Sequence, residues 1–200
     1  AYDAPMAEPN DAPRPSSPVR KPVLLGLFAG TAVGGGYLLA GIPNVEVMSL
    51  VTAVAGVVLG PVRGFLAGAL AAAVYSLGSP YGLPAPLLLA AQMAGLGSAG
   101  PVGHLVARGR GARDHRTGRA IALAAAGGLV ITVIHDVLTN LAILGMLDLP
   151  AAAVLAGAVP FFLVHAVSNM VIFGALLPSL AHRLARLAQP RLTGRPGPLV

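Results

Sequence analysis

The chain alternates between long apolar stretches and short polar gaps. A helix that crosses the hydrocarbon core of a bilayer needs about 20 mostly apolar residues. Six stretches meet or approach that length, and the second and third are the shortest. They cover residues 22–40, 45–59, 62–77, 86–107, 120–141 and 160–180. The pattern predicts an all-α integral membrane bundle of six transmembrane helices.

The segment 142–159 separates the last two stretches and is too apolar for an ordinary loop. We expect it to form a short re-entrant or interfacial helix that begins near Pro150. Pro160 suits the first turn of a helix, where a missing N–H leaves no bond unmade. The last spanning helix is therefore predicted to begin at Pro160.

Composition agrees with lipid as the solvent for most of the surface. Hydrophobic residues make up 56% of the chain and charged residues 10%, with a mean hydropathy of +0.78. Soluble domains carry about 25% charged residues. The chain has no cysteine, which excludes disulfides, thiol nucleophiles and cysteine-based zinc sites.

The 13 Lys and Arg residues fall in four groups. These are Arg14, Arg20 and Lys21; Arg63; five arginines within 108–119; and four within 183–195. Short cytoplasmic loops are enriched in Lys and Arg. Six spans place all four groups on one side, whereas five or seven would divide them. We therefore expect a multi-pass protein of the cytoplasmic membrane with both termini cytoplasmic, and no nucleic-acid partner despite the net charge of +6.

The two ends of the chain differ from the membrane domain predicted over 22–182. Residues 1–21 are rich in Pro, Ala and Ser, which predicts a disordered cytoplasmic tail. Residues 183–200 are expected to form a basic cytoplasmic tail. An alternative is that 1–21 and the following apolar stretch form a signal peptide, although Asp3, Glu8 and Asp11 would be unusual there.

Polar side chains at membrane depth are costly and are functional candidates. His135, Asp136 and Asn140 lie in the fifth stretch, and His165 and Asn169 lie in the sixth. At 1.5 Å per residue, both groups lie in the outer half of the membrane. They are predicted to bind a small molecule between two helices, with three loop residues closing the site. Those three are Asn44, Glu46 and Tyr81. The alternative is that these groups only bridge helices.

Other chemistries have weaker support. His135, Asp136 and His165 could supply three metal ligands, but no tighter spacing marks a metal site. Ser98 lacks the nucleophile-elbow frame, since Leu96 occupies the position of the first glycine. No phosphate-binding loop is present, so the chain does not use ATP by the usual route. We expect no catalytic residue, resident metal or cofactor; a metal-dependent intramembrane enzyme and an assembly protein without a ligand stay open as alternatives.

Five segments, in their order along the chain, resemble the substrate-binding S component of an energy-coupling factor (ECF) transporter, a vitamin-uptake family. They are Ile42-Pro43-Asn44-Val45-Glu46, Leu59-Gly60-Pro61 with Arg63-Gly64, Ser79-Pro80-Tyr81-Gly82 with Pro86-Leu87-Leu88-Leu89, Asp136-Val137-Leu138-Thr139-Asn140, and His165-Ala166-Val167-Ser168-Asn169. The resemblance extends over about residues 22–180. It implies six helices, a vitamin or similar micronutrient bound in the outer half, and as partners a transmembrane coupling subunit and two ATPase subunits.

The first stretch carries Gly26, Gly30 and Gly34, one every four residues. This spacing puts them on one face of a helix, where small residues allow another helix to approach closely. In the family that the chain resembles, small residues of the first helix dock on the coupling subunit. The three glycines are therefore predicted to contact that partner; the alternative is packing inside this chain.

Overall fold

The structure is a computed structural model that describes residues 20–79, 82–109 and 118–188. Within these ranges every regular element is an α-helix, which confirms the predicted all-α class. The six helices are α1 (Arg20–Leu39), α2 (Met48–Leu59), α3 (Pro61–Leu77), α4 (Pro86–Gly109), α5 (Gly118–Met146) and α6 (Ala151–Ala188). The predicted disordered tail, up to residue 19, and Tyr81 lie outside the described residues.

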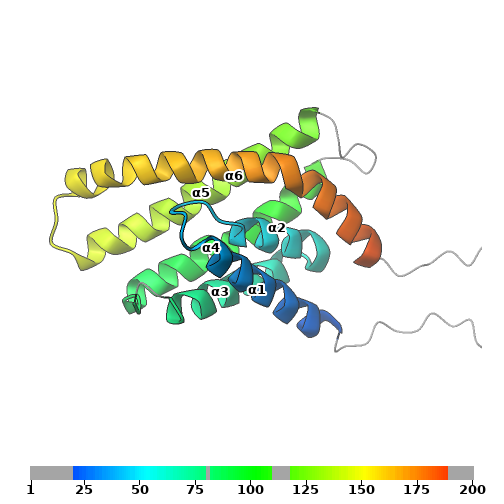
Figure 1. Cartoon of the computed structure of the whole chain (residues 1–200), viewed down its shortest axis with the longest axis horizontal. Helices are drawn as coiled ribbons and strands as arrows, with labels where there is room; N and C mark the ends of the chain where they lie inside the picture. The colour runs from blue at the N-terminus through cyan, green and yellow to red at the C-terminus, as the bar shows by residue number, and fades with distance from the viewer. Residues whose placement is uncertain (1–19, 80–81, 110–117, 189–200) are drawn as a thin grey trace, which may run out of the picture.

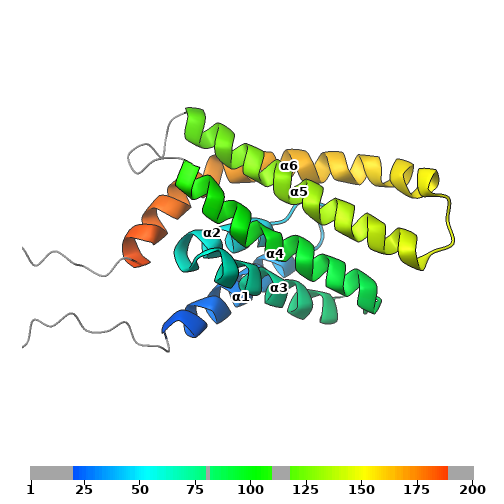
Figure 2. The ribbon, with the colours of Figure 1, turned by 180° about the vertical axis from the view of Figure 1, so that it is seen from behind.

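Consecutive helices alternate in direction along the bundle (Figures 1 and 2). The start of α1, the α2–α3 turn, the end of α4, the start of α5 and the end of α6 share one end. The Lys and Arg residues of the described ranges belong to these helix ends: Arg20, Lys21, Arg63, Arg108, Arg119, Arg183 and Arg186. We call this the basic end, and the other, with the α1–α2, α3–α4 and α5–α6 connections, the opposite end.

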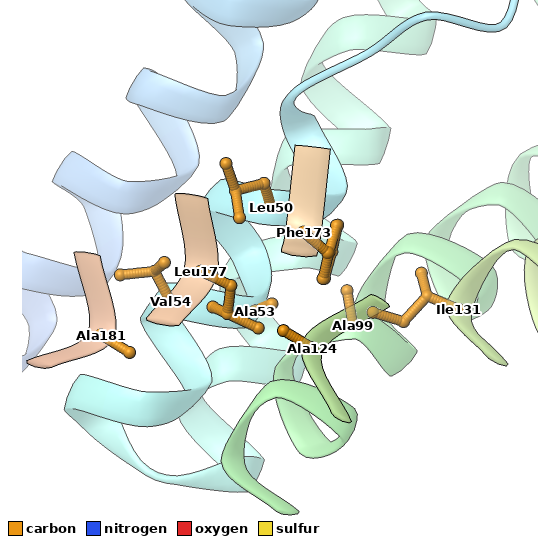
Figure 3. Close-up of a cluster of buried hydrophobic side chains, with 9 residues drawn as sticks. All are labelled: Leu50, Ala53, Val54, Ala99, Ala124, Ile131, Phe173, Leu177 and Ala181. Atoms are coloured by element: carbon orange, nitrogen blue, oxygen red, sulfur yellow. The ribbon is translucent and has the colours of Figure 1, made fainter. Parts of the chain in front are cut away.

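The short helix α2 lies at the centre of the bundle. It has 12 residues, contacts each of the other five helices, and buries nearly all of its first nine residues. Figure 3 shows three of them, Leu50, Ala53 and Val54, packed against side chains of three other helices. Those side chains are Ala99 of α4, Ala124 and Ile131 of α5, and Phe173, Leu177 and Ala181 of α6. At about 18 Å, α2 is too short to cross the hydrocarbon core alone.

Glycines let α2, α3 and α4 approach backbone to backbone. A Cβ atom on Gly56 would overlap the backbone of Gly100, and one on Gly100 would overlap the backbone of Gly64 and Phe65. Contacts this close are typical of helix packing in membranes, where small residues at the interface bring dispersion contacts into range. The close packing of these three helices therefore requires glycine, which has no Cβ atom, at these positions.

The outward surface of the helices is apolar. Leu27, Leu38, Leu105, Val137 and Val171 are among the many large aliphatic side chains that are more than half exposed. Three helical segments are long and apolar enough to cross a membrane: Lys21–Leu39, Gly118–Met146 and Ala151–Leu184. Helices α2 and α3 are apolar but shorter. These features are those of a membrane protein.

One sequence-based expectation is wrong: 142–159 does not form a separate short helix. Helix α5 continues to Met146, and α6 begins at Ala151 and passes through Pro160. In lipid, a helix break leaves backbone groups without water, so a proline is accommodated within a continuous helix. The break falls at residues 147–150, which include the polar Asp148 and Pro150.

Helix α6 also extends further toward the C-terminus than the predicted membrane domain. It has 38 residues, about 57 Å in length, and continues beyond residue 182 to Ala188. Figure 1 shows it bending in its last third, and Pro178 lies inside this part of the helix. A proline removes one backbone hydrogen bond and is a common cause of such a bend.

Candidate functional site

A cavity of about 770 Å³ lies near the opposite end of the bundle. Its wall is formed by the α1–α2 and α3–α4 connections and by parts of all six helices. Four predicted site residues line it: Asn44, Glu46, His135 and His165. The polar side chains Ser49, Tyr75, Ser76, Ser79 and Gln92 line it as well. One histidine of α5 and one of α6 therefore lie at the wall of this cavity.

His165 links three parts of the chain. Its Nδ1 atom lies 3.0 Å from Asp136 Oδ1 on α5, within hydrogen-bond distance. Its Nε2 atom lies 3.7 Å from Glu46 Oε1 in the α1–α2 connection, an ion-pair distance that is too long for a hydrogen bond. We call Glu46, Asp136 and His165 the charged cluster. The sequence predicted Asp136 and His165 at one depth and Glu46 in a loop that closes the site, and the structure brings the three together.

Glu46 also holds the start of α2. Its Oε2 atom accepts a hydrogen bond from the Ser49 backbone N–H at 2.9 Å. The N–H groups of a first helical turn have no partner inside the helix, and a negative charge there is favourable. Burial raises the pKa of the Glu46 carboxyl, but His165 and Ser49 lower it, and the balance leaves this pKa below its ordinary value.

The lowered pKa of Glu46 predicts an acid-sensitive contribution to stability. A carboxyl whose pKa falls on folding stabilises the fold above its ordinary pKa, about 4.3, and this contribution is lost as pH falls through the folded pKa. Wild type should therefore melt higher than Glu46→Gln at pH 7, and the difference should shrink as the pH falls below the ordinary carboxyl pKa. Melting curves of both proteins in one detergent test this. A pH-independent difference would contradict it.

A second cavity, of about 460 Å³, lies on the α5–α6 side of the charged cluster. It shares Asn44, Gln92, His135 and His165 with the first cavity, and Asp136 and Asn140 line it too. The Asn140 amide donates a hydrogen bond to the Asp136 carbonyl oxygen at 2.7 Å, within its own helix. Two cavities therefore meet at His165, and Asn140 belongs to the second.

Asn169 lies elsewhere. It is fully buried and lines neither cavity, although it is one helical turn from His165. Its Nδ2 atom donates a hydrogen bond to Thr132 Oγ1 at 2.9 Å, joining α6 to α5. This position favours a role in holding the two helices together.

The two positions on α6 predict a contrast. Asn169→Ala should lower the stability by about 1 kcal/mol, since interhelical hydrogen bonds in membranes contribute on that order. It should leave ligand affinity nearly unchanged. His165→Ala should weaken ligand binding about 5- to 150-fold, because it leaves buried partners unpaired. Melting temperature and affinity of both variants test the contrast, which equal affinity losses would contradict.

Gln92 and Ser76 were not singled out from the sequence, yet both line the large cavity. The Ser76 hydroxyl donates a hydrogen bond to Gln92 Oε1 at 2.9 Å, joining α3 to α4. Gln92 is a polar side chain in an apolar helix, so the rule that selected His135 would have selected it also. Tyr75 adds an aromatic wall, and its ring lies 4.9 Å from that of Tyr37.

The α1–α2 connection is held beside the cavity by a hydrogen bond from α6 to its backbone. Asn44 adopts a positive φ of 58°, a conformation that Asn tolerates better than most residues. Its carbonyl oxygen accepts a hydrogen bond from the Ser168 hydroxyl at 2.8 Å. Ser168 lies three residues from His165 on α6, so this bond holds Glu46 and His165 near each other.

The predicted docking residues Gly26, Gly30 and Gly34 are exposed on α1. A Cβ atom added at any of them would meet nothing within 4 Å. By contrast, a Cβ atom on Gly36 of the same helix would meet Met48 and Tyr75. The three glycines are therefore not used for close packing within the described chain.

Comparisons with known proteins identify no family for this chain. Protein-family models, curated proteins and solved structures were each compared with the chain, and none matches. Among the described residues, no group of three or more His, Cys, Asp or Glu side chains is arranged to hold a metal ion. The case for a function therefore rests on the fold and the site.

Proposed function

We propose that the protein is the membrane-embedded substrate-binding subunit of an ECF-type uptake transporter, and that its ligand is a vitamin or similar small micronutrient. The observation that carries this proposal is the cavity of about 770 Å³ beside the charged cluster. Sites for small molecules are typically concavities of about 300–1,000 Å³ with a few convergent polar groups. Charged groups inside an apolar bundle are costly and usually mark a functional site, and here they lie beside a cavity.

The proposal includes six spans with both termini cytoplasmic. The Lys and Arg residues of the described ranges lie at the basic end, which supports a cytoplasmic position for that end. The cavity then lies in the outer half, open to nutrients outside the cell. Helices α2 and α3 are short for spans, but the surrounding helices shield α2 from lipid.

This topology predicts a labelling pattern in intact cells. Cysteines introduced at Ser79 and Asp148 should react with an impermeant thiol reagent, whereas one at Thr117 should not. The natural chain has no cysteine, so no background labelling arises from it. Labelling of the Thr117→Cys protein from outside would contradict the six-span arrangement.

Uptake against a gradient needs an energy source, and the chain has no phosphate-binding loop. In the proposal, a transmembrane coupling subunit and two ATPase subunits supply it. The exposed face of Gly26, Gly30 and Gly34 offers a helix surface on which such a subunit could pack closely. The ligand then contacts Glu46, His135 and His165 in the large cavity.

Incubation with a panel of micronutrients tests this function against its alternatives. Purified protein in detergent should be thermally stabilised by one compound, and chromatography should recover that compound unchanged. An intramembrane enzyme would convert the compound. An assembly protein without a ligand would be stabilised by none, and either result would contradict the proposal.

A further inference from the structure

The charged and titratable side chains around the large cavity include carboxylates but no lysine or arginine. Among the described residues that line it, none is Lys or Arg. Its acidic and basic side chains are Glu46, His135 and His165, and Asp136 lies behind His165. While both carboxyls are ionised, the charged cluster carries a net negative charge whether or not His165 is protonated. An anionic ligand would therefore find no lysine or arginine to pair with, whereas a cationic ligand could pair with the Glu46 carboxylate.

One carboxylate oxygen of Glu46 accepts no hydrogen bond within the described structure. Its Oε2 atom is occupied by the Ser49 N–H, whereas Oε1 lies 3.7 Å from His165 Nε2. Within the described structure, Nε2 is buried without a hydrogen-bond partner, and His165 is only 7% exposed. His165 has Asp136 as its carboxylate partner at 3.0 Å.

The rest of the wall suits a cation as well. Tyr75 lines the cavity, and its ring is supported by that of Tyr37. The face of an aromatic ring attracts a positive charge within about 6 Å of its centre. Ser49, Ser76 and Gln92 add neutral polar groups that impose no charge on the ligand.

We propose that the cavity selects a ligand that carries a positively charged nitrogen, and that the Glu46 carboxylate binds this nitrogen directly. The proposal rests on the proposed function and narrows its class of ligand. His165 keeps Asp136 as its partner, and the ligand nitrogen binds Glu46 Oε1, the oxygen that accepts no hydrogen bond within the described structure. Anionic micronutrients of similar size are rejected, because the cavity offers them a carboxylate and no lysine or arginine.

Three fragments of one shape and different charge test the proposal: benzylamine, benzyl alcohol and benzoate. Their dissociation constants for the purified full chain at pH 7 can be measured by ligand-observed NMR. Benzylamine should bind at least about tenfold more tightly than benzoate, with benzyl alcohol between them. Glu46→Gln keeps the size of the side chain and an oxygen for the Ser49 N–H. It should weaken benzylamine about tenfold, since a hydrogen bond to a charged group contributes that much, and leave benzyl alcohol nearly unchanged.

Benzoate binding as tightly as benzylamine would overturn the proposal, as would an unchanged benzylamine affinity in Glu46→Gln. The order of the three fragments in wild type needs no variant, so it decides the matter even if Glu46→Gln fails to fold. Either contrary result would still show small-molecule binding and leave the proposed function standing. Absence of binding by all three fragments would overturn the charge preference; the proposed function is then judged by the compounds that the purified protein itself releases.

Discussion

Replacing Gly100 by leucine is expected to prevent the protein from folding. A Cβ atom at this position would overlap backbone atoms of Gly64 and Phe65 on α3, so no change of rotamer relieves the clash. Overfilling a packed core costs about 1–3 kcal/mol when side chains can move. Here α3 and α4 would have to separate, and the cost should exceed that range. Since α2 packs on both helices, the large cavity should be lost as well.

Gly109→Leu is the matched control. Gly109 ends the same helix, is exposed, and has nothing within 4 Å of an added Cβ. Size-exclusion profiles and melting temperatures in detergent should show an aggregated or absent Gly100→Leu protein and a Gly109→Leu protein close to wild type. A monodisperse Gly100→Leu protein with the wild-type melting temperature would show that the tight packing of α3 on α4 is not required.

Gly30→Leu is expected to separate folding from function. No atom lies within 4 Å of the added Cβ, so stability should change by less than about 0.5 kcal/mol. Ligand affinity should be unchanged, because Gly30 is not among the residues that line the cavity. Under the proposed function, association with the coupling subunit and uptake should both be lost, since a leucine prevents the close approach of another helix.

Gly36→Leu provides the contrast on the same helix. Gly36 is buried, lines the large cavity and faces Met48 and Tyr75. Its replacement should lower both melting temperature and ligand affinity. Co-purification with the coupling subunit, melting temperature and affinity, measured on both variants, distinguish the two faces of α1. A Gly30→Leu protein that misfolds, or that still assembles and transports, would contradict the assignment of this face.

The hydrophobic pattern was enough to predict most of the helices, because apolar length and polar gaps are local properties. Pro86 begins α4 as expected, and Gly60-Pro61 separates α2 from α3. Pro160 was misinterpreted because a proline at a helix start and one inside a helix have the same local sequence. Only the surroundings decide between them: in an apolar environment, a continuous helix loses one backbone hydrogen bond at the proline, whereas a break would leave several groups unpaired.

Depth along a helix was enough to bring Asp136 and His165 together, but it could not assign every polar residue to the cavity. Asn169 is four residues from His165 and shares its side of α6, yet it bonds to Thr132 between the helices. Which neighbour a helical face meets depends on tertiary packing, and periodicity does not specify it. The Glu46–His165 ion pair joins residues far apart in the chain, so only the fold shows its geometry.

Mass spectrometry of small molecules released from gently purified wild-type protein tests the central claim most directly. The protein should carry one defined nutrient-sized compound in near-stoichiometric amount, and His165→Ala protein purified in parallel should carry much less. Asn169→Ala protein, whose substitution lies outside both cavities, should carry the wild-type amount if it folds. Wild-type protein that releases no compound, and that no micronutrient of the panel stabilises, would contradict the assignment of a substrate-binding subunit.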